Sequence, residues 1–262
     1  MSDTAFAIDA IREAGQLARY FFEHRDQLLV DRKGPQDYVS DADRQVEACL
    51  IARISKRFPD DGFVGEESGL QAASREWVID PIDGTTNFLR GIPVFAITLA
   101  LVEDGRAVMG LIYDPMRDVL YEGSVTAGAR CNGIPIQPVW RSMLSESLIG
   151  LCHSSRLHPD QLTARIAAVL RSGAILRQPG SAALMLCDLA MGRIDGLYDA
   201  DLKAWDSVAG LLIAREAGAI ASDFLAKPDW RTAPQPTLAV APTLYPELSL
   251  LWPEIQTVVC LP

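Results

Sequence analysis

The sequence predicts a mixed fold in which an antiparallel sheet in the N-terminal half is followed by alternating strands and helices. Between Phe63 and Tyr121, short apolar runs are separated by polar turns, which is typical of an antiparallel meander. After Ser147, strand-like and helix-like segments alternate, as they do in an α/β layer. We therefore predict an N-terminal α+β lobe over residues 1–137 and a C-terminal α/β lobe over residues 138–262.

Two helices are expected before the sheet. From Ala5 to Leu29 the large apolar residues recur at spacings of three, four and seven, which is the period of one helix face. Lys33-Gly34-Pro35 ends this segment, because proline cannot continue a helix. The second helix runs from Asp41 to Arg57, and Ser40 and Asp43 have the spacing of a capping box at its start.

The strands of the first half are indicated by apolar and β-branched runs. They are Phe63–Val64, Trp77–Ile79, Phe95–Val102, Val108–Tyr113 and Val119–Tyr121. Turns rich in Asp, Gly and Pro separate the later runs, and Asn132-Gly133 indicates one more turn. Strands joined by such short turns pair antiparallel.

The second half has a different pattern, in which each predicted helix is followed by a glycine. Glycine at this position adopts the left-handed conformation that ends a helix. The predicted strands are Ser147–Leu151, Ala174–Leu176 and Gly196–Tyr198, and the predicted helices are Pro159–Ser172, Ser181–Met191 and Asp206–Ala217.

The composition is that of a globular protein and disfavours several functional and structural classes of protein. A net charge of −10 disfavours general nucleic-acid binding, which depends on clustered Lys and Arg. The five cysteines are odd in number and lack C-x-x-C spacing, which disfavours a zinc site or a disulfide framework. The first ten residues do not resemble a signal peptide, and no apolar stretch approaches the roughly 20 residues of a membrane span. We expect a cytoplasmic protein that does not bind a membrane.

The most informative segment is Trp77–Phe88. It places Asp80 and Asp83 at the end of an apolar run, directly before a Gly-Thr-Thr turn. Carboxylates there are suitable ligands for hard cations such as Mg²⁺, and two such ions hold a phosphoryl group between them in phosphate chemistry. The simpler alternative is that both residues only form turns. The metal interpretation is favoured, because a helix that starts at Gly84-Thr85 offers N–H groups to an anion.

Four other positions have a structural interpretation as well as a functional one. The Thr85 hydroxyl either orients a water molecule, which is the functional interpretation, or serves as an ordinary helix N-cap. Glu66 and its neighbour Glu67 either share a cation or form a solvated turn. Asp43 is favourable in the first turn of a helix without any catalytic role. Asp206 taken alone is an N-cap.

Together these segments resemble the inositol monophosphatase family of Mg²⁺-dependent, lithium-sensitive sugar phosphatases. Residues Trp77–Phe88 match the family pattern W-x-x-D-P-I-D-G-T-T-N-F without a departure. Further similar segments are Lys33–Asp43, Gly65–Ser68, Tyr113–Asp118, Gly180–Leu184 and Trp205–Gly210, so the resemblance covers nearly the whole chain. It implies a layered αβαβα sandwich of the sugar phosphatase type, a site between the two lobes, and a homodimer.

The resemblance also implies a set of metal ligands for two, or with a weaker site three, Mg²⁺ ions. One ion would be bound by Glu66, Asp80 and the carbonyl of Ile82. A second would be bound by Asp80, Asp83 and Asp206. The weaker third ion would use Glu66 and waters.

Catalytic and substrate-binding groups follow from the same resemblance. Thr85, with either Asp43 or Glu66, would activate the attacking water. The amides of Gly84 and Thr85 would bind phosphate oxygens. The alcohol part of the substrate would contact Asp83, Ser154, Ser181, Ala182 and Asp199.

Two departures from the family pattern concern the choice of substrate. Asp199 stands where the family has Glu, and Met185 stands where bacterial relatives commonly have Asp. Both reduce the expectation of a strict inositol preference and leave the metal ligands unchanged. Thr86-Asn87 nevertheless favours the inositol-type members over the bisphosphate-nucleotide and histidinol-phosphate types.

The sequence therefore predicts Mg²⁺-dependent hydrolysis of a small phosphomonoester, preferably inositol 1-phosphate or a similar polyol phosphate. Alternatives that would use the same site are histidinol phosphate, fructose 1,6-bisphosphate and a 3′-phosphonucleotide. An alternative from another class is a non-catalytic regulatory protein of the same fold, linked to RNA-processing machinery. The acidic net charge and the intact ligand set disfavour pure binding.

Overall fold

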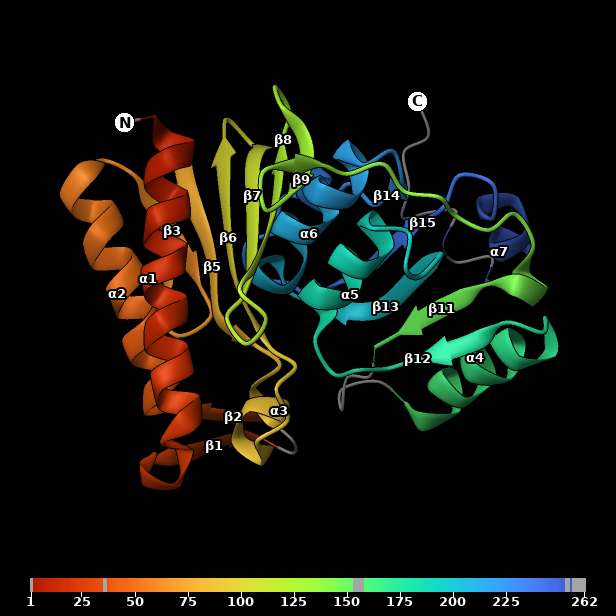
Figure 1. The fold of residues 1–262 in the computed structure, drawn as a ribbon, viewed down its shortest axis with the longest axis horizontal. Helices are drawn as coiled ribbons and strands as arrows, with labels where there is room; N and C mark the ends of the chain where they lie inside the picture. The colour runs from red at the N-terminus through yellow and green to blue at the C-terminus, as the bar shows by residue number, and fades with distance from the viewer. Residues whose placement is uncertain (1, 35–36, 153–157, 253–254, 256–262) are drawn as a thin grey trace.

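The computed structural model describes residues 2–34, 37–152, 158–252 and 255. Its elements form five layers in the order αβαβα (Figure 1). Helices α1 (Asp3–Glu23) and α2 (Asp41–Arg57) cover one face of an eight-stranded sheet, and α5 (Ala182–Ala190) and α6 (Ala204–Glu216) lie between this sheet and a five-stranded one. Helices α4 (Pro159–Arg171) and α7 (Tyr245–Leu251) cover the far side. The predicted fold class is confirmed.

The eight-stranded sheet has the order β10-β9-β8-β7-β6-β5-β3-β4. All its pairs are antiparallel except β3 with β5, which are parallel. The predicted meander is therefore confirmed from β5 onward. The strands are β3 (Gly62–Gly65), β4 (Gly69–Gln71), β5 (Arg75–Asp83), β6 (Ala96–Glu103), β7 (Arg106–Asp114), β8 (Val119–Ser124), β9 (Gly128–Cys131) and β10 (Ile134–Pro135).

Both faces of this sheet are buried, which explains why its central strands are continuous apolar runs. In β5, Trp77 and Ile79 pack with α1 and α2, whereas Val78 packs with the middle helices. Successive side chains of a strand point to opposite faces, so one strand supplies two cores. Trp77 is fully buried, and its indole N–H donates to Asp61 over 2.7 Å.

The five-stranded sheet has the order β12-β11-β13-β15-β14. β11 is parallel to both β12 and β13, and β15 is antiparallel to its neighbours. Parallel strands require crossover helices, and α4 and α5 provide them, as the alternating sequence pattern predicts. The strands are β11 (Leu148–Leu151), β12 (Ile175–Arg177), β13 (Gly196–Leu202), β14 (Ile220–Ala221) and β15 (Gln235–Val240).

The first predicted helix is shorter than expected. It ends at Glu23, and a 3₁₀ turn, η1 (Arg25–Gln27), follows. The chain then forms an antiparallel hairpin of β1 (Val30–Gly34) and β2 (Asp37–Ser40), which the sequence analysis missed. Leu29 is 71% exposed, so its helical spacing did not reflect a buried face.

Other elements were also missed, and several of them are very short. They are β4, β9, β10, β14, the 3₁₀ turns η2 (Leu144–Glu146) and η3 (Phe224–Ala226), and the C-terminal pair β15 and α7. A strand of two or three residues is too short to show alternation, so hydrophobic periodicity does not detect it.

The predicted boundary at residues 137 and 138 falls between β10, the last strand of the first sheet, and η2. The division into two lobes stays a prediction. Within the described parts of the chain, no helix has both the length and the apolar character needed to cross a membrane.

Candidate active site

Strand β5 positions the first two acidic residues. Its pairing with β6 is regular up to Asp80 and resumes at Asp83 after a register shift. Pro81 explains the interruption, because it has no N–H to donate to the neighbouring strand. The Ile82 amide instead donates to the Asp80 carboxylate over 2.9 Å. This bulge leaves both carboxylates buried, with Asp80 1% and Asp83 7% exposed.

Helix α6 positions the third acidic residue. The helix begins at Ala204 with Lys203 at the N-cap, so Asp206 lies at the third helical position. Its carboxylate accepts a 2.8 Å hydrogen bond from the Lys203 amide. The expectation that Asp206 is itself the N-cap was wrong, because the capping-box arrangement starts the helix two residues earlier.

These three residues converge on one point. One carboxylate oxygen from each of Asp80, Asp83 and Asp206 lies within 4.8 Å of the others. Asp80 and Asp83 come from the eight-stranded sheet, and Asp206 comes from the middle helical layer. Carboxylate oxygens at this separation form a donor set that suits a hard divalent cation.

The electrostatics of Asp80 support the same interpretation. Burial raises the pKa of Asp80 well above its ordinary value, and the charges of Glu66, Asp83 and Asp206 raise it further, in that order. Among the residues that the structure describes, neither Asp80 nor Asp83 forms an ion pair with Lys or Arg. Buried carboxylates that repel one another are stabilised by a bound cation. The donor set therefore fits Mg²⁺.

The carboxylate of Asp83 also contacts the start of helix α5. It accepts hydrogen bonds from the Ser181 hydroxyl and from the amides of Ala182, over 3.3 Å, and Ala183, over 2.9 Å. Burial raises the pKa of Asp83 to about 6, and these donors oppose the rise. The predicted substrate-binding residues Ser181 and Ala182 thus lie directly beside a predicted metal ligand.

Gly84 makes the turn from β5 into the short helix α3 (Thr85–Arg90). Its φ angle is 101°, in the left-handed region that favours glycine. A Cβ atom there would lie 3.1 Å from the Val94 carbonyl oxygen and 3.2 Å from that of Gly180. The Thr85 hydroxyl donates to the Ile82 carbonyl over 3.1 Å, so these two predicted site groups face each other.

Glu66 lies in the turn after β3 and is half-buried. A buried residue that the sequence analysis missed holds this turn. Glu47 of α2, 2% exposed, accepts hydrogen bonds from the amides of Glu67, over 3.1 Å, and Ser68, over 2.7 Å. Its position one turn after Asp43, on the apolar face of α2, was the available signal.

Asp43 has the helix-capping role that the sequence predicts, and its catalytic role stays a prediction. One carboxylate oxygen accepts from the amide and the hydroxyl of Ser40, over 2.8 and 2.7 Å, and completes the predicted capping box. The other oxygen is buried and has no hydrogen-bond partner in the described structure. Burial raises the pKa of Asp43, and the Glu67 charge adds to this. The helix cap therefore uses only one oxygen of the Asp43 carboxylate.

The remaining predicted substrate contacts differ in their surroundings. Ser154 lies outside the described residues. Asp199 in β13 is 2% exposed and accepts a 2.6 Å hydrogen bond from the Asp201 amide. Burial raises the pKa of the Cys152 thiol, and the Asp199 charge raises it further. Met185 is 2% exposed and packs in the core of the middle layer.

Thr98 is a second site neighbour that the sequence analysis missed. It lies opposite Asp80 on β6, is 1% exposed, and hydrogen-bonds both strand β5 and helix α6. The available signal was its position as the only hydroxyl side chain within the apolar run Phe95–Val102.

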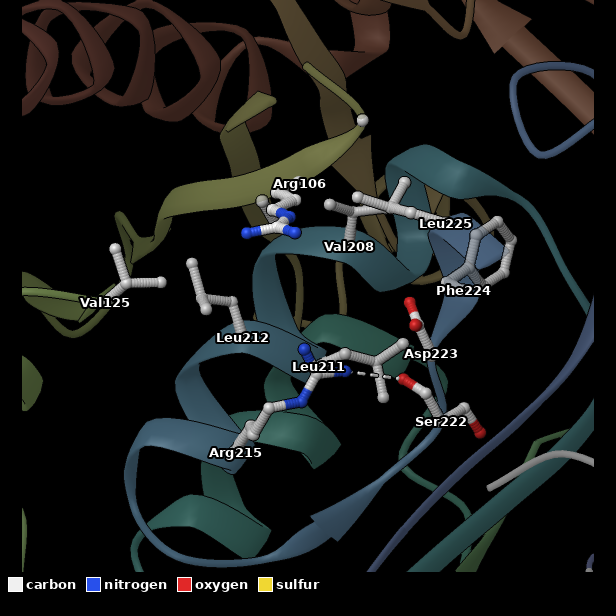
Figure 2. Close-up of a pocket in the computed structure, with 12 residues that line it drawn as sticks. Arg106, Val125, Val208, Leu211, Leu212, Arg215, Ser222, Asp223, Phe224 and Leu225 are labelled. Carbon is white, nitrogen blue, oxygen red and sulfur yellow. Dashed lines mark hydrogen bonds between the residues drawn. The ribbon is translucent and has the colours of Figure 1, made fainter. Parts of the chain in front are cut away.

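A cavity of about 300 Å³ lies elsewhere, between the β6–β7 turn, α6 and η3. Figure 2 shows apolar side chains such as Leu211 and Phe224 around it, and Arg215 hydrogen-bonded to the Ser222 carbonyl. It contains none of the predicted site residues. The acidic cluster, and not this cavity, has the chemistry of an active site.

Comparison with known proteins places the chain in a family. The model of the inositol monophosphatase family matches residues 2–257. The chain belongs to the inositol monophosphatase family. Membership supports phosphomonoesterase activity.

Individual relatives agree with this family. An inositol-1-monophosphatase of Mesorhizobium japonicum is 40% identical over 83% of this chain and 84% of its own length. The Nus factor SuhB of Vibrio cholerae is 36% identical over 86% of both chains. The solved structure of the Thermotoga maritima IMPase has a TM-score of 0.86 at 28% identity, covering 98% of this chain and 99% of that one.

Proposed function

We propose that the protein hydrolyses a small phosphomonoester in a Mg²⁺-dependent reaction, preferably inositol 1-phosphate or a similar polyol phosphate. The observation that carries the proposal is the convergence of Asp80, Asp83 and Asp206 within 4.8 Å. The relative from Mesorhizobium japonicum, whose name specifies inositol 1-phosphatase activity, supports the choice of substrate.

The proposed metal ligands are those that the family resemblance implies, and the convergence of Asp80, Asp83 and Asp206 supports one of the two sets. Glu66, Asp80 and the Ile82 carbonyl would hold one Mg²⁺. Asp80, Asp83 and Asp206 would hold the second, and a weaker third ion would use Glu66. When bound, Mg²⁺ supplies Lewis-acid polarisation of the phosphoryl group and neutralises its developing charge.

The chain's own groups would orient the substrate and the water. The amides of Gly84 and Thr85 would donate to phosphate oxygens at the start of α3. The Thr85 hydroxyl, with Asp43 or Glu66, would orient and deprotonate the attacking water. Attack on phosphorus breaks the phosphorus–oxygen bond to the alcohol, and the products are inorganic phosphate and the free alcohol.

The alcohol part would lie beside Asp83 and the start of α5. Asp83, Ser181, Ala182, Asp199 and Ser154 are the proposed contacts. The short Asp199 side chain already accepts a hydrogen bond from the Asp201 amide. A polyol other than inositol is therefore an explicit alternative, as are histidinol phosphate, fructose 1,6-bisphosphate and a 3′-phosphonucleotide.

The names of several relatives favour a second candidate function. Proteins named Nus factor SuhB are about as similar to this chain as the named phosphatases are. A regulatory role through RNA-processing machinery, in addition to or instead of catalysis, is therefore the alternative. We also propose a cytoplasmic homodimer.

A phosphomonoester panel tests the proposal. Purified protein is assayed for phosphate release from inositol 1-phosphate and the three alternative substrates, with Mg²⁺ and with EDTA. We expect the highest kcat/KM for inositol 1-phosphate and no turnover with EDTA. Absence of release from every substrate at millimolar Mg²⁺ would contradict the enzymatic proposal and favour the regulatory one.

A further inference from the structure

Thr98 connects two segments that carry acidic residues of the site. Its hydroxyl accepts a 3.2 Å hydrogen bond from the Asp80 amide and donates a 2.8 Å hydrogen bond to the Trp205 carbonyl. Asp80 belongs to β5 of the eight-stranded sheet, and Trp205 directly precedes Asp206 in the first turn of α6. One hydroxyl therefore links the backbone of Asp80 to the backbone next to Asp206.

The arrangement leaves this hydroxyl little freedom. Thr98 is 1% exposed and lies directly opposite Asp80 in the β5–β6 pairing. A β-branched side chain in a strand is restricted at its first torsion angle, so the hydroxyl keeps its orientation. The register shift after Asp80 makes this link more important, because the regular strand pairing stops there.

The link lies beside the carboxylates that repel one another. Asp80 lies beside the charges of Glu66, Asp83 and Asp206, and a shift of α6 away from β5 would relieve part of this repulsion. The hydrogen bond from Thr98 to Trp205 opposes that shift. Supporting groups of this kind change metal affinity by about 10–100-fold when they are removed, even though they do not touch the metal.

We propose that Thr98 is a positioning residue that holds Asp80 and Asp206 at the separation needed to bind a divalent cation. The inference rests on the proposed function for its metal ligands. A purely structural role is the alternative, since any buried hydroxyl with two partners contributes to stability.

Direct metal binding separates the two roles. Mn²⁺ serves as the probe, and its binding to metal-free protein is measured by electron paramagnetic resonance, with Tm measured in parallel. The key pair is Thr98→Ser and Thr98→Ala, because both lose the methyl group and only Ser keeps the hydroxyl. Thr98→Val is the third variant, since it keeps the volume of the side chain.

Ser147→Ala is the control for loss of a buried hydroxyl. Ser147 is 1% exposed, and its hydroxyl donates to the Met143 carbonyl over 2.7 Å, outside the acidic cluster. We expect this variant to lose stability and to bind Mn²⁺ as the wild type does. We expect Thr98→Ala and Thr98→Val to bind Mn²⁺ at least about tenfold more weakly, and Thr98→Ser to recover most of the affinity.

Equal Mn²⁺ affinity in Thr98→Ser and Thr98→Ala, with wild-type binding intact, would overturn the positioning role and leave the proposed function standing. Absence of Mn²⁺ binding by the wild type would overturn both. If Thr98→Val does not fold, the comparison of Ser with Ala still decides the question, because these two variants differ only in the hydroxyl.

Discussion

Asp83 and Ala183 are joined by a 2.9 Å hydrogen bond from the Ala183 amide to the Asp83 carboxylate, although they lie 100 positions apart in the chain. The bond connects the end of β5 to the first turn of α5. Asp83 therefore has two partners in the proposed enzyme, the donors of α5 and the cation. Its position depends on the packing of the middle helices against the first sheet.

Replacement of this carboxylate is the sharpest test of the metal ligands. We expect Asp83→Asn to lower kcat/KM by at least about 10²-fold, the scale of removing one strong electrostatic contact. Asp160→Asn is the matched control, since Asp160 is an exposed carboxylate on α4. Near wild-type turnover in Asp83→Asn, measured with saturating Mg²⁺, would contradict the assignment.

The metal-free protein is expected to lose stability as the pH rises. Burial raises the pKa of Asp83 from 3.8 to about 6, and it also raises the pKa of Asp43, Glu47, Asp80 and Asp114. Between the ordinary pKa of these groups and their raised pKa in the folded protein, the folded state binds more protons than the unfolded state. The free energy of unfolding therefore falls as the pH rises. Each tenfold difference in proton affinity corresponds to about 1.4 kcal/mol.

Thermal unfolding in EDTA at about pH 5 and about pH 7.5 checks this sign. We expect Tm to be lower at the higher pH by about 3 °C or more. Saturating Mg²⁺ should remove the part of the difference that comes from Asp80 and Asp83, because a cation bound by these two carboxylates takes the place of their protons. A Tm that is independent of pH in EDTA would show that these groups are not protonated in the folded protein.

Glu76 and Arg231 form a contact that supports the packing of the layers. Glu76 in β5 is 1% exposed and accepts three hydrogen bonds of 2.7–3.0 Å from the Arg231 guanidinium. Arg231→Ala would leave this carboxylate buried without its ion-pair partner, at a cost of about 3–5 kcal/mol. The matched control is Arg12→Ala, which removes an exposed ion pair with Asp118 and should cost less than about 1 kcal/mol. Urea unfolding of both variants measures the difference.

Gly84 is expected to matter through close packing as well as through its backbone conformation. Gly84→Ala places a methyl group against two backbone carbonyls, whereas Gly105→Ala, also in the left-handed region, meets nothing within 4 Å. Both variants should lose about 1–2 kcal/mol from the left-handed conformation. Only Gly84→Ala should also have a lower kcat/KM, because the carbonyls of Val94 and Gly180 must move, and this shifts the backbone at the start of α3. An equal loss of activity in both variants would contradict this explanation.

The sequence predicts the parts of the fold that have strong local patterns. The helix at Asp41–Arg57 is confirmed to the residue, because its cap and its apolar face agree. The first helix was overextended, since Leu28 and Leu29 fit the helical period although Leu29 is exposed. The parallel pairing of β3 with β5 was not predictable locally, because the short strand β4 first pairs antiparallel with one side of β3 before the chain crosses to the other side as β5.

In the candidate site, too, the residues with a local pattern were predicted and those that depend on long-range contacts were not. Asp80 and Asp83 were recognised because they stand together in one short segment. Thr98 and Glu47 were missed, because their importance comes from contacts with segments distant in sequence: Trp205 for Thr98, and the Glu67–Ser68 turn for Glu47. A polar residue in an otherwise apolar strand or helix face was the only local signal.

The dependence of the site on α5 and α6 has a consequence for biosynthesis. A nascent chain that has left the ribosome only as far as β10 already contains Asp43, Glu66, Asp80 and Asp83. It lacks the amides that hold Asp83 and the helix that supplies Asp206. Its acidic side chains therefore remain without their fixed geometry until helices α5 and α6 have been synthesised and have packed against the first sheet.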